Sequence, residues 1–316
     1  MKSKIHLLVL LWILSVAILM SILIVNSINF NTADAVPVDF SITKDINTTS
    51  YNQDVFRLAV SSVISPVETV KGYRPLIKYL EDKLGRRIEL VQRTTYKEVN
   101  DLVETGEIDL AFICTLSYVE AEKNFRAKLV AAPQVQGSAY YRSLVIVRED
   151  SNINTIADLQ NKKFAFTDPM SFSGRAAMIG ELATIGRSPE DMFSSIIYTY
   201  SHDNSLRAVA DGVVDAACID SLVFDLTAEL YPEITNKIRI IHTSPFVGNP
   251  PVILGADTSE EEFNMIRKIL LNMHNEEAGR RALETLMYDK FLMPDNDSYN
   301  YIRSLIEEVR IDYYVR

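Results

Sequence analysis

Two segments of the sequence align without a gap when the chain is shifted by 106 residues. The run RLAVS at 57–61 falls on KFAFT at 163–167, and GEIDLAFI at 106–113 falls on GVVDAACI at 212–219. Any two βα units share apolar strands and glycine stops, but one register kept over residues 57–118 favours a common architecture. We therefore expect two halves that are built from the same order of elements.

Each copy alternates strand-like and helix-like segments, which is typical of a parallel sheet covered by helices. Ser65 and Glu68 predict a capping box for a helix that ends at Gly85. A second capping box begins at Thr95, and its helix is closed by Gly106. Short apolar runs predict buried strands at 88–91, 108–113, 164–167, 196–200 and 214–219.

The remaining segments indicate how the two halves connect. Strand-like runs at 141–148 and 238–243 can carry the chain out of the first lobe and back, and helical patterns follow at 259–273, 276–290 and 298–309. We predict an α/β fold of two lobes, each a mainly parallel sheet flanked by helices, joined by two hinge strands. The predicted boundaries are residues 54–138 and 247–316 for lobe 1, and residues 139–246 for lobe 2.

The N-terminus predicts the compartment. An apolar run of 21 residues at 5–25 follows two lysines, so it can span a bilayer and leave the rest of the chain outside. A cleavable signal peptide is the alternative, because ADA at 33–35 offers small residues for cleavage. No cysteine directly follows the run, which argues against a lipoprotein anchor. We assign residues 1–26 to a transmembrane anchor or signal peptide, and residues 27–53 to a flexible linker.

Composition and charge exclude several classes of function. The balance of 32 Lys+Arg against 42 Asp+Glu gives a net charge of -10, which leaves no electrostatic footprint for nucleic acid. Cys114 and Cys218 are too few for a disulfide scaffold or a four-ligand zinc site, and the 4 histidines lack metal-ligand spacing. We expect no nucleic-acid partner, no metal and no cofactor.

The repeat names candidate ligand positions in pairs. Ligands of open parallel sheets bind beyond the carboxyl ends of the strands, where helix N-termini attract anions. Two facing lobes would direct several such ends at one small oxyanion. The paired positions at helix starts are Ser65 with Ser171, Tyr96 with His202, and Thr115 with Ser221.

The sharpest local motif is DPMSFSG at 168–174. Ser171 and Ser173 offer two hydroxyls at a helix start, and Gly174 lets a backbone approach a phosphate-like group closely. The alternative is an ordinary serine N-cap. Asp109 and Asp215 occupy equivalent positions early in their strands, so we expect them to be structural.

These segments resemble the type 2 periplasmic solute-binding proteins of phosphonate, phosphite and phosphate ABC transporters. The resemblance covers most of residues 54–305 and is carried by the segments 73–85, 106–118, 141–147, 168–174 and 201–220. It implies that Ser171 and Ser173 grip the oxyanion. It also implies that Tyr96, Tyr141 and His202 complete the site.

The sequence departs from this family at three positions. Phe172 replaces the central threonine of the serine stretch, which removes a hydroxyl and adds bulk. The carboxylates that hold an aminoalkyl group in some family members align with Leu222 and Pro250, so Asp220 is the nearby acid that remains. The resemblance therefore favours a compact oxyanion such as phosphate, phosphite or a small phosphonate.

We predict a monomeric extracytoplasmic protein, anchored at the periplasmic or extracellular side of the cytoplasmic membrane, that captures a small oxyanion for an ABC-transporter permease. The alternative is a receptor of the same fold that signals to a partner histidine kinase, because both would use the same closing cleft. A hydrolase would need a positioned base, and the sequence has no Gly-x-Ser-x-Gly elbow, so we expect no enzyme. The predicted ligand-binding residues are Ser65, Tyr96, Thr115, Tyr141, Ser171, Phe172, Ser173, Gly174, His202 and Asp220.

Overall fold

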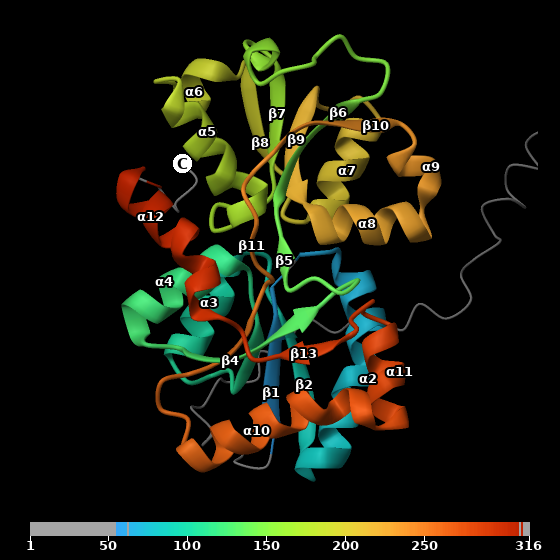
Figure 1. Cartoon of the computed structure of the whole chain (residues 1–316), viewed down its shortest axis with the longest axis vertical. Coiled ribbons are helices and arrows are strands. Elements are labelled where there is room, and N and C mark those ends of the chain that lie inside the picture. Colours follow the sequence, from blue (N-terminus) through green and yellow to red (C-terminus); the bar gives the residue numbers. More distant parts are fainter. Residues whose placement is uncertain (1–54, 62, 310, 312–316) are drawn as a thin grey trace, which may run out of the picture. The chain divides into compact units, whose positions relative to one another are not determined.

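Two sheets organise the chain, and each contains one copy of the repeat (Figure 1). The computed structural model describes residues 55–61, 63–309 and 311, all of which belong to one compact unit, residues 52–316. The predicted anchor and linker lie outside these residues. Within the described residues, no helix has the length and apolar character that a membrane span requires.

The first sheet has the strand order β13-β4-β12-β3-β1-β2. Four strands run in one direction: β1 (Val55–Val60), β2 (Arg87–Gln92), β3 (Leu110–Phe112) and β4 (Lys128–Gln134). Two strands run in the other: β12 (Val252–Leu254) and β13 (Lys290–Leu292). The helices of this lobe are α2 (Pro66–Leu84), α3 (Tyr96–Glu104), α4 (Thr115–Phe125), α10 (Glu260–Asn272) and α11 (Glu277–Glu284).

The second sheet has the order β10-β6-β9-β7-β8. Its strands are β6 (Ser143–Arg148), β7 (Lys163–Phe166), β8 (Ser195–Tyr198), β9 (Ala216–Asp220) and β10 (Ile238–Thr243), and β6 alone runs against the others. Its helices are α5 (Ala177–Thr184), α6 (Pro189–Met192), α7 (His202–Ala210), α8 (Ser221–Leu230) and α9 (Pro232–Thr235). Both sheets are therefore mainly parallel, as predicted.

The register of the repeat is confirmed element by element. Helices α3 and α7 begin and end 106 residues apart, and α4 and α8 begin 106 residues apart. The predicted structural role of the paired aspartates also holds. The amide of Arg57 donates to Asp109 Oδ2 at 2.6 Å, and the amide of Lys163 donates to Asp215 Oδ2 at 2.8 Å. Each aspartate thus ties the start of one strand to the strand beside it.

The chain crosses between the sheets at two short strands. β5 (Tyr140–Tyr141) and β11 (Val247–Gly248) pair antiparallel with each other and lie between the two sheets (Figure 1). The strand predicted at 141–148 is therefore two strands, since Arg142 separates β5 from β6. We still propose that the lobes divide after residues 138 and 246. The strands of the second sheet all lie within residues 139–246, and those of the first sheet all lie outside this range.

Several local predictions hold and others are wrong. The first helix begins at Pro66 and ends at Gly85 as predicted, but Ser65 forms no side-chain cap, so no capping box exists there. The capping box of Thr95 and Glu98 is present. Strands β2 and β8 are edge strands, and Ile88 is the one residue of these two strands that is buried. The helix predicted at 276–290 ends at Glu284, and β13 follows it.

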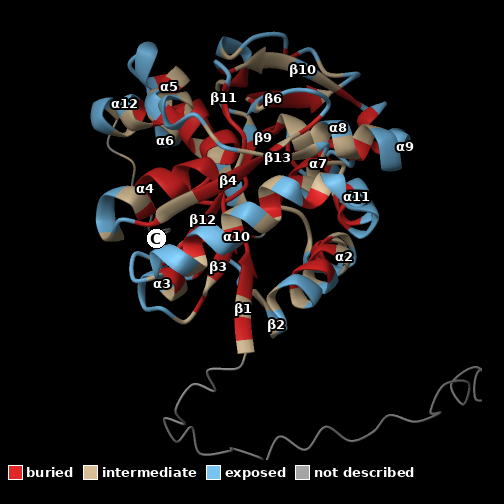
Figure 2. Cartoon of the chain, turned by 60° about the horizontal axis from the view of Figure 1, so that its bottom comes forward, coloured by how far each residue is buried: buried red, intermediate tan, exposed pale blue. Residues whose placement is uncertain are grey.

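Burial follows the layers of the fold. Strands β1, β6 and β9 are largely buried, whereas α10 turns an exposed face outward (Figure 2). One apolar cluster draws on both lobes, because it contains Tyr96 and Ile253 from lobe 1 and Phe172 and Ala177 from lobe 2. The cores of the two lobes are therefore continuous at this cluster.

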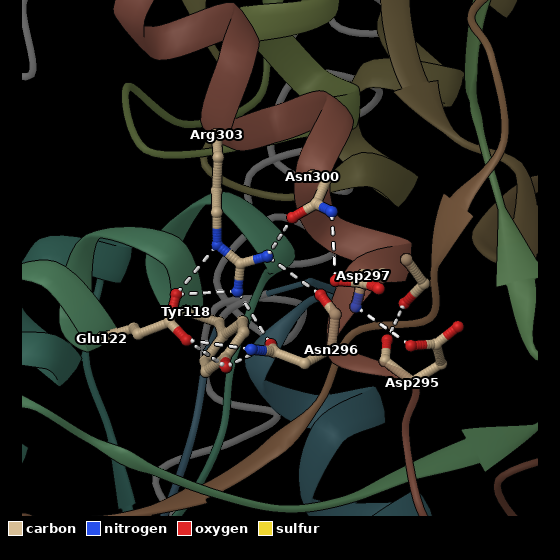
Figure 3. A network of polar contacts seen from close by, with 8 residues as sticks. Tyr118, Glu122, Asp295, Asn296, Asp297, Asn300 and Arg303 are labelled. Carbon is tan, nitrogen blue, oxygen red and sulfur yellow. Dashed lines mark hydrogen bonds and ion pairs between the residues drawn. The ribbon is translucent and has the colours of Figure 1, made fainter.

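Helix α12 (Asn300–Glu308) contacts elements of both lobes. Arg303 donates to Glu122 Oε2 of α4 through Nη2 at 2.7 Å and through Nε at 3.0 Å (Figure 3). The ring of Tyr301 lies edge-on to Phe172 at 6.0 Å, and Leu305 packs against Gly180 of α5. The C-terminal helix thus bridges lobe 1, through polar contacts, and lobe 2, through apolar ones.

Candidate functional site

The predicted site residues lie where strands end and helices begin in both lobes. Nine of the ten are buried, and Ser65 is partly exposed. Thr115 Oγ1 lies 2.7 Å from the Tyr141 hydroxyl, and Cys114 Sγ lies 3.9 Å from Ser171 Oγ. Ser221, the repeat partner of Thr115, instead accepts from the Arg142 amide with its hydroxyl at 3.2 Å. The structure therefore brings Thr115 of lobe 1 together with Tyr141 of lobe 2. Ser221 instead bonds to Arg142, in the segment that crosses between the lobes.

The serine-rich turn gives its two serines different roles. Ser171 Oγ accepts the Gly174 amide at 2.9 Å, so Ser171 is the N-cap of a π-helical turn, Phe172–Ala176, that leads into α5. The Ser173 carbonyl accepts from Ser143 Oγ at 2.6 Å, which fixes the turn against β6. The ordinary N-cap role is thus correct for Ser171, while the Ser173 hydroxyl is left for another partner.

Gly174 is needed for a contact within the protein. A Cβ atom built at Gly174 would lie 2.5 Å from both Cβ and Oγ1 of Thr167 and 2.9 Å from Ser171 Oγ. Gly174 thus permits the close approach of Thr167, which directly follows β7, and the approach of a phosphate-like group to this turn stays a prediction.

Four buried hydroxyls near these strand ends lack partners. Among the described residues, Tyr96 OH, Ser173 Oγ, Ser61 Oγ and Ser201 Oγ have no hydrogen-bond partner. Leaving a buried polar group unsatisfied costs about 1–3 kcal/mol, so such groups call for an explanation, of which a ligand is one. Ser61 was missed by the sequence reasoning, although it ends the first strand in the repeat position of Thr167.

The two site tyrosines remain protonated at neutral pH. Burial raises the pKa of both Tyr96 and Tyr141 well above the ordinary value. The hydrogen bond between Thr115 and Tyr141 opposes this rise in the pKa of Tyr141. Phe172, predicted in the ligand set, lies edge-on to Tyr141 at 6.2 Å and to Tyr301, so its ring packs in the core. Both phenols are therefore neutral hydrogen-bond donors.

His202 is a neutral ring with a defined orientation. Its Nδ1 accepts the Asp220 amide at 3.0 Å and lies 3.2 Å from Thr167 Oγ1. Burial lowers the pKa of His202 to about 3. Because Nδ1 accepts a hydrogen bond, the ring carries its proton on Nε2 and can donate from there. Its backbone amide is already bonded to the Val63 carbonyl at 2.9 Å.

Asp220 caps a helix. Its Oδ1 accepts the Leu222 amide at 2.7 Å, which makes it the N-cap of α8. Burial raises the pKa of Asp220 to about 7. The carboxyl group is thus partly protonated at neutral pH and can then donate a hydrogen bond to an anion.

We expect Asp220→Asn to change how stability depends on pH. Because burial raises the pKa of Asp220 above that of the unfolded chain, the folded state holds its proton more tightly, and the free energy of unfolding falls as pH rises from about 4 to about 7. Asn retains the capping oxygen without ionising. Urea unfolding at about pH 5 and about pH 8 should show the variant gaining about 2 kcal/mol relative to the parent at the higher pH. An equal difference at both pH values would contradict the raised pKa.

Carboxylates of lobe 2 occupy helix N-termini of lobe 1. Asp168 Oδ2 accepts the Tyr96 amide at 3.1 Å, and Asp203 Oδ1 accepts the Ser65 amide at 3.0 Å. Our expectation that these backbone amides are free for an external anion is therefore wrong, because the positive ends of α2 and α3 attract these nearby carboxylates. Burial raises the pKa of Asp168 to about 6. These two hydrogen bonds connect the lobes. The groups that remain to donate hydrogen bonds to an external anion are therefore mainly side chains.

A cavity of about 500 Å³ adjoins this region. Its walls come from both lobes and are mainly apolar. Of the ten predicted site residues, Ser65 and Asp220 line it. Ser61, Leu222 and Pro250 also line it. Asp220 connects this wall to His202 through its amide. We use the name donor cluster for Tyr96, Tyr141, Ser173 and His202, none of which lines the cavity.

Comparison with known proteins adds independent information. Residues 58–299 match the family described as "ABC transporter, phosphonate, periplasmic substrate-binding protein". The chain is 35% identical over 167 residues to the phosphate-import protein PhnD of Mycolicibacterium smegmatis, covering 49% of this chain and 52% of that protein. It is 25% identical over 224 residues to the phosphonates-binding periplasmic protein of Escherichia coli, covering 69% of this chain and 66% of that protein.

Solved structures share the fold. The binding protein component of an ABC phosphonate transporter from Pseudomonas aeruginosa superimposes with a TM-score of 0.75 at 23% identity, covering 80% of this chain and 85% of that one. PhnD1 from Prochlorococcus marinus, in complex with methylphosphonate, gives a TM-score of 0.73 at 18% identity, covering 81% and 98% of the two chains. The two-lobed arrangement is therefore confirmed.

Proposed function

This chain belongs to the periplasmic substrate-binding proteins of phosphonate ABC transporters, and from that premise we propose that it captures a phosphorus oxyanion between its lobes and delivers it to an ABC permease. The observation that carries the proposal is the pair of buried hydroxyls, Tyr96 OH and Ser173 Oγ, that lack partners among the described residues. In this proposal the protein acts at the outer face of the cytoplasmic membrane, held there by residues 1–26.

The donor cluster fits an anion that is bound without a cationic side chain. Tyr96, Tyr141 and Ser173 offer hydroxyls, and His202 offers Nε2–H. Each hydrogen bond to a charged oxygen contributes about 1.5–3 kcal/mol. Four such bonds contribute about 6–12 kcal/mol, so after an association cost of about 4 kcal/mol the binding free energy reaches about -8 kcal/mol, which is micromolar affinity, at the upper end of this range.

We propose that the protein binds its ligand without transforming it. His202 is oriented by a backbone amide rather than by a carboxylate, and its pKa of about 3 makes it a weak base at neutral pH. Ser171 Oγ is engaged with the Gly174 amide. Ser171 and His202 therefore do not form the pair of nucleophile and oriented base that covalent catalysis requires. The relatives of this chain are named for import and binding.

Isothermal titration calorimetry of the full chain in mild detergent tests the proposal. Phosphate, phosphite, methylphosphonate, aminoethylphosphonate and sulfate would be titrated separately. We expect micromolar affinity for at least one phosphorus oxyanion, because the donor cluster offers four neutral hydrogen-bond donors. Failure of every phosphorus compound to bind, in protein that melts cooperatively, would contradict the proposal.

A further inference from the structure

The ring of Phe172 lies between two other aromatic rings. It is edge-on to Tyr141, with ring centroids 6.2 Å apart and planes at 76°, and edge-on to Tyr301, with centroids 6.0 Å apart and planes at 84°. Aromatic pairs favour this geometry, because the positive edge of one ring meets the negative face of the other. The three rings therefore form a continuous row from Tyr141 of the donor cluster to helix α12.

The row meets the donor cluster at two points. Tyr141 belongs to the cluster, and Phe172 directly precedes Ser173 in the π-helical turn. The Phe172 ring is fully buried, and the Ser173 carbonyl accepts from Ser143 Oγ at 2.6 Å. Because the buried ring and the Ser173 hydroxyl are carried by neighbouring residues of one short turn, the position of each depends on the other.

The turn offers one free hydroxyl to a ligand. Ser171 Oγ is engaged with the Gly174 amide, whereas the buried Ser173 hydroxyl lacks a partner among the described residues. Phe172, between the two serines, has no group that can donate a hydrogen bond to an anion. Its side chain can therefore influence an oxyanion by holding the donors beside it in place.

Helix α12 holds the outer ring of the row. Arg303 is bonded to Glu122 of lobe 1 (Figure 3). Leu305 packs so closely on Gly180 of lobe 2 that a Cβ atom built on the glycine would lie 2.6 Å from Leu305 Cδ1. Tyr301 is in the same helix and is partly buried against the apolar cluster that contains Phe172. The Tyr301 ring is thus supported from both lobes by contacts that do not involve Phe172.

We propose that Phe172 and Tyr301 are positioning residues of the oxyanion site. Tyr301 holds the Phe172 ring, and Phe172 holds Ser173 and Tyr141 where they donate to the ligand. The inference rests on the proposed function and deepens it, because it makes the C-terminal helix part of the machinery that sets the affinity. Neither ring is assigned a contact with the ligand.

Amide hydrogen exchange of the full chain in mild detergent, without ligand, is the first test. We expect Tyr301→Ala to speed exchange in residues 171–177 at least threefold, because the Phe172 ring loses one of its two edge-on partners. Such a pair strengthens local packing by a factor of about 2–10. Tyr301→Phe keeps the ring and should exchange at the parent rate. Residues 263–270 of α10 should exchange as before in both variants.

Calorimetry with methylphosphonate and with inorganic phosphate is the second test. Tyr301→Ala should weaken binding about three- to tenfold, because a smaller fraction of the protein holds the turn in its binding geometry. Tyr301→Phe should bind like the parent. Ile266→Val is the matched control, since it deletes a buried methyl group from a separate core cluster of lobe 1. It should lower the melting temperature and leave the affinity unaltered.

A double-mutant cycle shows whether Tyr301 acts through Phe172. If it does, the protein with both Phe172→Ala and Tyr301→Ala should bind within twofold of Phe172→Ala alone, because Tyr301 then has no ring to hold. Independent effects would multiply instead. Phe172→Leu takes the place of Phe172→Ala if the alanine variant does not fold, since leucine leaves a smaller gap and also lacks the aromatic ring.

The outcomes separate the two proposals. Unaltered affinity in Tyr301→Ala, unaltered exchange in residues 171–177, or losses that multiply in the cycle would each overturn the positioning role and leave the proposed function standing. So would a loss of affinity in Ile266→Val as large as that in Tyr301→Ala. Absence of binding by the parent protein to every phosphorus compound would overturn the proposed function, and this inference with it.

Discussion

Replacing Tyr96 with Phe and Ser173 with Ala in one protein should weaken phosphorus oxyanion binding at least 100-fold without destabilising the ligand-free protein. Both hydroxyls are buried and lack partners among the described residues. Removing them relieves a desolvation cost of about 1–3 kcal/mol each, whereas two lost bonds to a charged oxygen cost about 3–6 kcal/mol, which is about 10²–10⁴-fold in affinity. Calorimetry gives the affinity, and thermal unfolding gives the stability.

Ser117→Ala is the matched control for this double variant. Ser117 also has a buried hydroxyl without a partner, but it lies in α4 and outside the donor cluster. We expect the stability to change in the same direction and the affinity to stay as it is. Ser171→Ala should behave differently again, since loss of an N-cap costs about 1 kcal/mol of stability. If the double variant bound the oxyanion with full affinity, the ligand site would have to lie elsewhere in the protein.

Gly174→Ala should destabilise the protein and weaken binding together. The new Cβ would lie 2.5 Å from Thr167 Cβ, an atom attached directly to the backbone, so the turn or the end of β7 must shift. Overpacking of this kind costs about 1–3 kcal/mol and occasionally more. Because Ser173 belongs to the same turn, we expect at least a tenfold loss of affinity, measured by calorimetry beside a urea unfolding curve.

Gly72→Ala provides the comparison for glycine replacement. Its Cβ would meet the flexible Leu286 Cδ2 at 3.2 Å, within helix α2. Alanine is favoured over glycine in a helix by about 1 kcal/mol, so stability should be maintained or rise. If Gly174→Ala were tolerated as well as Gly72→Ala, the close packing of the turn against Thr167 would be disproved.

The fold could be predicted in large part because its signals are local and repeated. Apolar runs and glycine stops recur at the same spacing, and the capping box at Thr95 marks the start of α3, so the starts of α3 and α7 followed from one register. Strand β13 could not be predicted in this way. It has only three residues, and it follows a turn at Met287. Met287 adopts a φ of 56°, and the sequence contains no glycine there that would predict such a turn.

The site could be predicted less completely, because its contacts join distant segments. The sequence identified DPMSFSG but could not show that Ser171 folds back onto Gly174 while Ser173 does not. It also could not show that Asp168 and Asp203 reach across to helices of the other lobe. Such contacts depend on how closely the lobes approach, and periodicity within one lobe carries no information on that distance.

The bridging position of α12 has a consequence for how the molecule denatures. Two lobes with separate interiors could melt one after the other. Here Tyr301 and Leu305 pack on Phe172 and Gly180, while Arg303 of the same helix is bonded to Glu122. Unfolding of either lobe removes the contacts that α12 makes with it, so we expect the two lobes of the described chain to unfold in one transition.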